Sequence, residues 1–450
     1  MKRLFVLAAV LAGIVLLSCH DCLAAPSMEI KLPEDPTKAY ITLGILFVAA
    51  VMFFTEVVPL PITALLVPVA LSICNVIPSK TAFGYFGDPT VVLFMAMFIV
   101  GEATFITGFA DKVGNFAVRA AKGNPVKLLV YIMTAIGLLS TVLSNTGTTV
   151  VAVPMVLGIC MSARLAPGKL LMPVAFASSL GGTVTLVGTP PNGIVNSMLE
   201  QMGVQPFGFF EFGLIGIPLL VAGLVYFGLI GHRLLPDSRI LDDESLDQAV
   251  EKRRTEKMWL CIGIFGFVVF MMASEVMNLT TAAVLGACLM VITRCMTMRE
   301  AFRSVDWTTI FLFAGMLSMS AAMDKSGAAA IVANAVVSRV SDPWVLMLVC
   351  CALTAIVTNF MSNTATAALM APLALPIASA SDISPLPIVM GIAMAASSCF
   401  LTPIATPPNT IVLGPGGYKF VDYIKAGWPL QVIALLMCWL LIPMIWPFHP

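Results

Sequence analysis

The chain has 450 residues, of which 59% are apolar and 11% are charged, and its 24 Lys and Arg residues balance its 24 Asp and Glu residues. A soluble globular chain carries about 25% charged residues, so this composition excludes an ordinary soluble protein and predicts a polytopic membrane protein. With zero net charge and no basic tail or acidic block, the sequence does not indicate a nucleic-acid partner. The chain contains no HExxH motif and no pair of Cys-x-x-Cys motifs, so we expect no zinc site.

The first segment, residues 1–39, allows two interpretations. Its residues 1–27 have a basic start, a short apolar core and small residues near Ala24, which is the pattern of a signal peptide, and the run ending at Cys19 resembles a lipidation site. Residues 4–19 fit a short first span equally well, so both a span and a cleaved signal stay open. The rest of the segment is expected to be an external linker.

Twelve apolar segments follow, at residues 40–57, 60–77, 89–109, 126–160, 171–199, 212–231, 258–275, 279–293, 307–322, 344–380, 387–413 and 427–446. The segments 126–160 and 344–380 are too long for one span and too short for two comfortable spans. Each contains a Ser-Asn-Thr run near its middle, and each fits a helical hairpin that enters and leaves the membrane on the same side.

The two halves of the chain repeat one another at a nearly constant offset. Three pairs of motifs match in the same order: TEVVPLPITALL at 55–66 with SEVMNLTTAAVL at 274–285, Ser-Asn-Thr at 144 with the same run at 362, and GTPPN at 188 with ATPPN at 405. We therefore predict two repeats, at residues 40–231 and 258–450, with a charged cytoplasmic linker at 232–257. No separate soluble domain is expected.

The basic residues predict how the repeats cross the membrane. If residue 40 begins outside and each repeat makes five crossings, the inside segments hold 19 of the 24 Lys and Arg residues. This split agrees with the positive-inside rule. An odd number of crossings inverts the second repeat, and inverted repeats are typical of secondary transporters. We predict an all-α polytopic membrane protein with two inverted repeats of five spans, each with a re-entrant helical hairpin and a broken helix.

The motifs GTPPN and ATPPN predict the helix breaks, because two successive prolines cannot continue an α-helix. The predicted breaks are at Thr189, Pro190, Pro191, Asn192, Thr406, Pro407, Pro408 and Asn409. Backbone freed at membrane depth is tolerated only around an enclosed cavity, where carbonyls can ligate a cation and helix N-termini can face an anion. One polar run would be explained by helix packing or a kink. Two such runs at matched spacing favour a binding site composed of two similar half-sites.

Three acidic residues are further candidates. Glu56 and Glu275 occupy equivalent places near segment ends, where each fits a proton or gating group but more often an interfacial structural carboxylate. Glu102 lies inside an apolar run and has no acidic equivalent in the second repeat, so a coupling role is a hypothesis for it.

At these motifs the chain resembles the divalent anion/sodium symporter family, which includes sodium-coupled dicarboxylate and sulfate carriers. The resemblance covers most of residues 40–446, and SSLGGTVTLVGTPPNGIVN and ATPPNTIVLGPGGY carry it together with TEVVPLPITALL and both Ser-Asn-Thr runs. It implies a homodimer in which a mobile transport domain moves against a scaffold domain, in an elevator-type mechanism. A bacterial inner (plasma) membrane is the expected location.

The resemblance also implies a set of site residues. The substrate carboxylates would be contacted by Ser144, Asn145, Thr146, Ser362, Asn363 and Thr364. One sodium site would use Ser140, Ser144, Asn145 and Gly188, and the other Thr358, Met361, Asn363 and Ala405. The first motif reads SNTGTTV where many dicarboxylate carriers read SNTATTA, a departure that bears on substrate choice more than on ion binding. The soluble insert of some sulfate-type relatives is absent.

The expected function is sodium-coupled symport of small divalent anions, with C4-dicarboxylates such as succinate, malate or fumarate as the expected substrates. Sulfate or another inorganic divalent anion is the alternative substrate, and sodium-independent dicarboxylate exchange is the alternative mechanism. No cofactor is expected other than the coupling ion Na+. A channel would need a continuous pore, which paired hairpin tips do not favour. An enzyme would need a nucleophile with a base, or a metal, and no such set is present.

Overall fold

The computed structural model describes residues 36–55, 57–109, 112, 124–163, 165–237, 254–274, 276–337 and 342–449. Residues 1–35 of the first segment, most of the predicted linker, and Glu56 and Glu275 lie outside this part. All elements of the described part are helical. Five of these helices are long and apolar enough to cross a membrane, or six if the bent pair at 298–326 counts as one span. The fold is therefore that of a multi-pass membrane protein.

The first half of the chain forms α2 (Thr37–Thr55), α3 (Leu60–Ile73), α4 (Ser79–Gly84), η1 (Tyr85–Gly87), α5 (Pro89–Ile106), α7 (Pro125–Ser140), α8 (Asn145–Ala163), η2 (Pro167–Lys169), α9 (Leu171–Gly182), α10 (Pro190–Gln201), α11 (Gly213–Tyr226), the π-helix η3 (Phe227–Gly231) and α12 (His232–Leu234). The second half forms η5 (Thr255–Lys257), α13 (Met258–Ala273), α14 (Leu279–Ile292), α15 (Met298–Ser304), α16 (Trp307–Ser326), α17 (Ala328–Val337), α18 (Pro343–Thr358), α19 (Asn363–Ala380), α20 (Pro385–Ser397), α21 (Pro407–Leu413) and α22 (Phe420–Ile445).

Equivalent residues begin equivalent helices in the two halves. Asp88 caps α5 by accepting a hydrogen bond from the Thr90 amide at 2.9 Å, and Asp306 caps α16 in the same way. Asn124 and Asp342 likewise cap α7 and α18. Such caps satisfy amides that have no partner inside the helix, and each stabilises it by about 1 kcal/mol. Short polar residues at matched positions therefore begin matched helices in the two halves.

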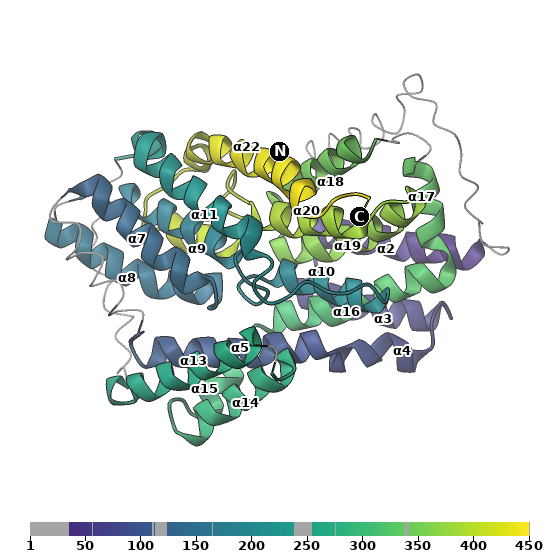
Figure 1. Cartoon of the computed structure of the whole chain (residues 1–450), viewed down its shortest axis with the longest axis horizontal. Coiled ribbons are helices and arrows are strands. Elements are labelled where there is room, and N and C mark those ends of the chain that lie inside the picture. Colours follow the sequence, from purple (N-terminus) through teal and green to yellow (C-terminus); the bar gives the residue numbers. More distant parts are fainter. Residues whose placement is uncertain are drawn as a thin grey trace.

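Most of the helices form two groups, which we name by their members. The framework group contains α2–α5 and α13–α16, in which α3 packs on α16 and α5 packs on α14. The hairpin group contains α7–α10 and α18–α21, in which α7 packs on α9 and α18 packs on α20. In Figure 1, α13, α14 and α15 of the framework group lie at the bottom of the view, and α18 and α20 of the hairpin group lie at the top.

The hairpin group is interlaced across the two halves. Helix α10 of the first half packs on α19 and α20 of the second half. Helix α21 of the second half packs on α8 and α9 of the first half. Each helix that follows a break therefore covers a hairpin that belongs to the other half.

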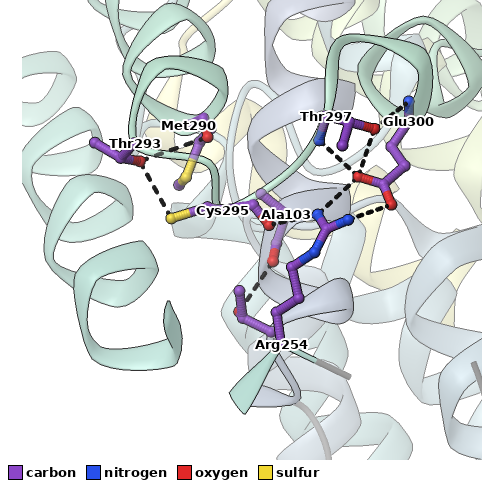
Figure 2. A network of polar contacts seen from close by, with 8 residues as sticks. Ala103, Arg254, Met290, Thr293, Cys295, Thr297 and Glu300 are labelled. Atoms are coloured by element: carbon purple, nitrogen blue, oxygen red, sulfur yellow. Dashed lines mark hydrogen bonds and ion pairs between the residues drawn. The ribbon is translucent and has the colours of Figure 1, made fainter. Parts of the chain in front are cut away.

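The chain returns from the linker at Arg254, which ties the start of the second half to the framework group. The Arg254 guanidinium makes two hydrogen bonds to the Glu300 carboxylate, at 2.8 and 2.9 Å, and its main-chain amide donates to the Ile106 oxygen at the end of α5. Figure 2 shows Glu300 also accepting from Thr297, whose capping box begins α15. Arg254 thus joins the end of the linker to α5 through its main chain and to α15 through its side chain.

Candidate functional site

The first Ser-Asn-Thr run lies where α7 ends at Ser140 and α8 begins at Asn145. Ser140 and Ser178 are fully buried, and their hydroxyl oxygens lie 3.1 Å apart. The Ser178 hydroxyl donates to the main-chain oxygen of Asn145 at 2.9 Å. These contacts join the turn between α7 and α8 to the last turns of α9.

The Asn145 side chain lies inside a cage of oxygen atoms. The Asn145 amide is assigned the orientation in which its NH₂ group faces these acceptors. Its nitrogen then lies 2.7 Å from Ser140 Oγ, 3.1 Å from the Ser178 main-chain oxygen and 3.3 Å from the Gly188 main-chain oxygen. A Cβ at Gly188 would lie 2.8 Å from the Thr141 oxygen, so only glycine allows this close approach. The structure therefore brings together Ser140, Asn145 and Gly188, three of the predicted sodium ligands.

The loop before α10 is bonded to the same turn. Thr189 precedes the helix in an extended conformation, and Pro190 and Pro191 occupy its first turn, so the interruption covers residues 183–189. The Thr185 hydroxyl donates to the main-chain oxygen of Thr141, and Asn192 Nδ2 donates to the main-chain oxygen of Thr185 at 2.9 Å. The hydroxyl of Thr189 is buried and has no hydrogen-bond partner among the described residues.

The second half builds the same connection with equivalent residues. The Thr402 hydroxyl donates to the main-chain oxygen of Asn359, in the turn between α18 and α19. Asn409 Nδ2 donates to the main-chain oxygen of Thr402 at 3.0 Å, and Thr406 precedes α21 in an extended conformation, with Pro407 and Pro408 following. The interruption covers residues 398–406. Each loop is thus fixed to the hairpin turn of its own half.

The second Ser-Asn-Thr run has its own local geometry. Ser362 caps α19 by accepting from the Ala365 amide at 3.2 Å, as Ser144 accepts from the Gly147 amide at 3.1 Å in the first run. Asn363 is 8% exposed and Thr364 is 5% exposed, whereas Thr146 of the first run is exposed. The two runs therefore present their threonines differently.

The remaining predicted ligands of the second half are buried. The Thr358 hydroxyl donates to the main-chain oxygen of Ala396 at 2.6 Å, and both Met361 and Ala405 are buried. No hydrogen bond given for the described residues joins Asn363 to Thr358, or the first Ser-Asn-Thr run to the second. Glu102 lies half-buried on α5, and its coupling role stays a hypothesis.

Sequence reasoning missed several residues that hold the site together. Ser178, Thr185, Asn359 and Thr402 were not predicted, although Thr185 and Thr402 each precede the Thr-Pro-Pro-Asn run by four residues. Gln431 was missed as well: its Oε1 accepts from Asn359 Nδ2 at 3.2 Å. The two threonines could have been predicted from a longer motif that occurs in both halves, Thr-x-x-x-Thr-Pro-Pro-Asn. No comparable motif surrounds Gln431.

The nearby chemistry is neutral. Residues 140–149, 178–192, 358–366 and 396–409 contain no Lys, Arg, Asp, Glu or His. Within the described ranges, no group of three or more His, Cys, Asp and Glu residues could hold a metal ion. The site can therefore offer hydroxyl, amide and main-chain groups, which suit an alkali cation and hydrogen bonds to an anion.

Comparison with known proteins places the chain among transporters. It is 26% identical to the uncharacterized transporter YfbS of Escherichia coli, over 90% of this chain and 99% of that protein. It is 24% identical to the sodium-dependent dicarboxylate transporter SdcS of Staphylococcus aureus, over 92% of this chain and 88% of that protein.

A solved structure shares the fold. The crystal structure of the YdaH transporter of Alcanivorax borkumensis matches with a TM-score of 0.63 at 17% identity, covering 100% of this chain and 99% of that chain. A family model described as a citrate transporter matches residues 50–382 and 318–449. These findings confirm the resemblance to the divalent anion/sodium symporters and the expectation that the chain is not an enzyme. The chain belongs to the citrate transporter family, CitMHS.

Proposed function

We propose that this transporter couples the uptake of a small divalent anion, best represented by C4-dicarboxylates such as succinate, malate and fumarate, to entry of Na+. The observation that carries the proposal is the oxygen cage around Asn145. An amide NH₂ group here lies among a hydroxyl oxygen and two main-chain oxygens. Such oxygens suit a small hard cation, and rotation of the Asn145 amide would replace its nitrogen with a further oxygen ligand.

The anion would be bound between the two Ser-Asn-Thr runs. Helices α8 and α19 each begin at the Asn of a run, so each presents the positive end of a helix dipole there. With no basic side chain in these segments, bound Na+ would supply the charge that balances two carboxylates. The similarity to SdcS, which is sodium-dependent and carries dicarboxylates, supports this choice of ion and substrate.

The same proposal includes the movement. The matching order of helices in the two halves and the uneven distribution of basic residues support two inverted repeats, with one hairpin re-entering from each side of a bacterial plasma membrane. The hairpin group would be the mobile transport domain of an elevator, and the framework group would be the scaffold, at which two copies form a homodimer.

Uptake into proteoliposomes tests the proposal. Labelled succinate and labelled sulfate would each be supplied with an inward sodium gradient and with choline in its place. We expect sodium-dependent uptake of succinate. Equal succinate uptake in choline would favour sodium-independent exchange over symport. Uptake of sulfate alone would make sulfate the substrate, and uptake of neither anion would refute this substrate class.

A further inference from the structure

The residue directly after each Ser-Asn-Thr run differs between the halves: it is Gly147 in the first half and Ala365 in the second. Both residues donate a main-chain hydrogen bond to the serine that caps their helix. The cap therefore does not require glycine. The reason for Gly147 lies on a different helix.

The ring of Phe105, on α5 of the framework group, occupies the space next to Gly147. A Cβ added at Gly147 would lie 2.6 Å from Phe105 Cε2, 3.0 Å from Ser144 Oγ and 3.4 Å from Phe105 Cδ2. The first distance is too short for any real side chain, the second is a tight contact, and the third is close to an ordinary van der Waals contact. Phe105 is 3% exposed, so its ring has little room to move away.

A second contact joins the same two segments, but here the glycine lies on α5 and the large side chain lies beside the Ser-Asn-Thr run. Leu143 precedes the first Ser-Asn-Thr run, and its Cδ2 would lie 3.7 Å from a Cβ at Gly101 of α5. Gly101 and Phe105 are four residues apart and so share one face of α5. Leu143 and Gly147, also four residues apart, flank Ser144, Asn145 and Thr146. A large residue meets a glycine at both ends of the run.

The second half lacks this arrangement. Helix α16 packs on α19 as α5 packs on α8, but the positions equivalent to Gly101 and Phe105 are Met319 and Met323, both buried. Methionine is flexible and adapts to irregular space, so it fixes a neighbour less firmly than a glycine–aromatic contact does. The framework helices that pack on the two hairpins therefore carry different side chains at these positions.

We propose that Phe105 is a positioning residue for the first Ser-Asn-Thr run. Through Gly147, and together with the contact of Leu143 with Gly101, it sets the place of Asn145 relative to the oxygen cage. The Gly147/Ala365 difference then reflects the neighbouring helix and not the choice of anion. This inference rests on the proposed function, because it assigns Phe105 to the affinity of that same site.

The test compares four variants by uptake of labelled succinate in sodium gradients. Gly147→Ala should raise the half-saturating concentrations of Na+ and succinate about tenfold, because overpacking displaces the run, while the maximal rate changes less. Gly158→Ala, on the same helix, adds a methyl group that meets nothing within 4 Å and should behave as wild type. Ala365→Gly in the second run should also leave both concentrations within about twofold, because its neighbours adapt.

The decisive variant combines Gly147→Ala with Phe105→Leu. Leucine lacks the Cε2 atom and ends near the Cδ2 position, so both half-saturating concentrations should return to within about threefold of wild type. Failure of this rescue, or a Gly147→Ala variant that matches Gly158→Ala, would overturn the inference. If Gly147→Ala does not fold alone, the folding of the double variant and its affinities still decide the question. Absence of sodium-dependent uptake by the wild type would instead refute the proposed function.

Discussion

The hydroxyl of Thr185 donates a hydrogen bond to the main-chain oxygen of Thr141, and so joins the loop before α10 to the turn between α7 and α8. Thr402 makes the equivalent bond to Asn359 in the second half. In each half an asparagine then bonds the main-chain oxygen of that threonine. These bonds run in series, so in each half they connect the hairpin turn to the helix that follows the break.

Removing one of these hydroxyls should uncouple the loop from the hairpin turn. Thr185→Val and Thr402→Val keep the shape of the side chain but leave a carbonyl oxygen without its donor, which costs about 1–3 kcal/mol for a buried group. We expect a lower unfolding temperature in detergent and weaker succinate uptake. Thr185→Ser and Thr402→Ser keep the hydroxyl and serve as controls; valine variants that equal the serine variants would contradict this role.

The two asparagines of the Ser-Asn-Thr runs should each be essential. Asn145→Ala and Asn363→Ala remove groups proposed to contact the cation and the anion together, so uptake of succinate should fall to background. Size-exclusion chromatography should show that both variants remain folded, because each side chain lies at a helix start rather than in the apolar core. Normal transport by either variant would return its run to a packing role.

Sodium should stabilise the purified protein without any substrate. A ligand that binds only the folded state adds about 2.7 kcal/mol of stability at a concentration one hundred times its dissociation constant. Replacing choline chloride with sodium chloride at constant ionic strength should therefore raise the unfolding temperature. Asn145→Ala should show a smaller rise, and an identical rise in wild type and variant would place the bound ion elsewhere.

The ion pair between Arg254 and Glu300 should contribute to folding rather than to transport. Arg254→Gln removes the two hydrogen bonds to the Glu300 carboxylate, and because both side chains are 34% exposed the loss should be roughly 1–2 kcal/mol. Asp237→Asn is the matched control, since Asp237 pairs with Lys169 at 3.2 Å but is 84% exposed. Thermal unfolding measures the stability of both variants. Equal losses of stability would show that the two hydrogen bonds between Arg254 and Glu300 add no more than the exposed pair does.

The sequence predicted the parts of the site that depend on local chemistry. Successive prolines at 190–191 and 407–408 cannot lie inside a helix, and in the structure they occupy the first turns of α10 and α21. The two Ser-Asn-Thr runs were found because their spacing repeats. Asn145 and Gly188, which the family resemblance placed together, are brought together by the fold.

Contacts between distant segments could not be predicted in the same way. The contact of Phe105 with Gly147 depends on how α5 packs against α8, and no local sequence pattern predicts that packing. Gln431 reaches Asn359 only because α22 passes the turn after α18. An amphipathic pattern helps little here, since in a membrane both lipid-facing and core-facing sides of a helix are apolar.

Because α10 packs on α19 and α21 packs on α8, we expect the two halves to depend on each other for folding. A polypeptide that ended at residue 237 would contain one complete hairpin, but the helix that covers it would be missing. Two polypeptides, one for each half, would have to be produced together and would bind each other through these crossed helices. The duplicated halves thus resemble a dimer whose subunits have exchanged a helix and are joined into one chain.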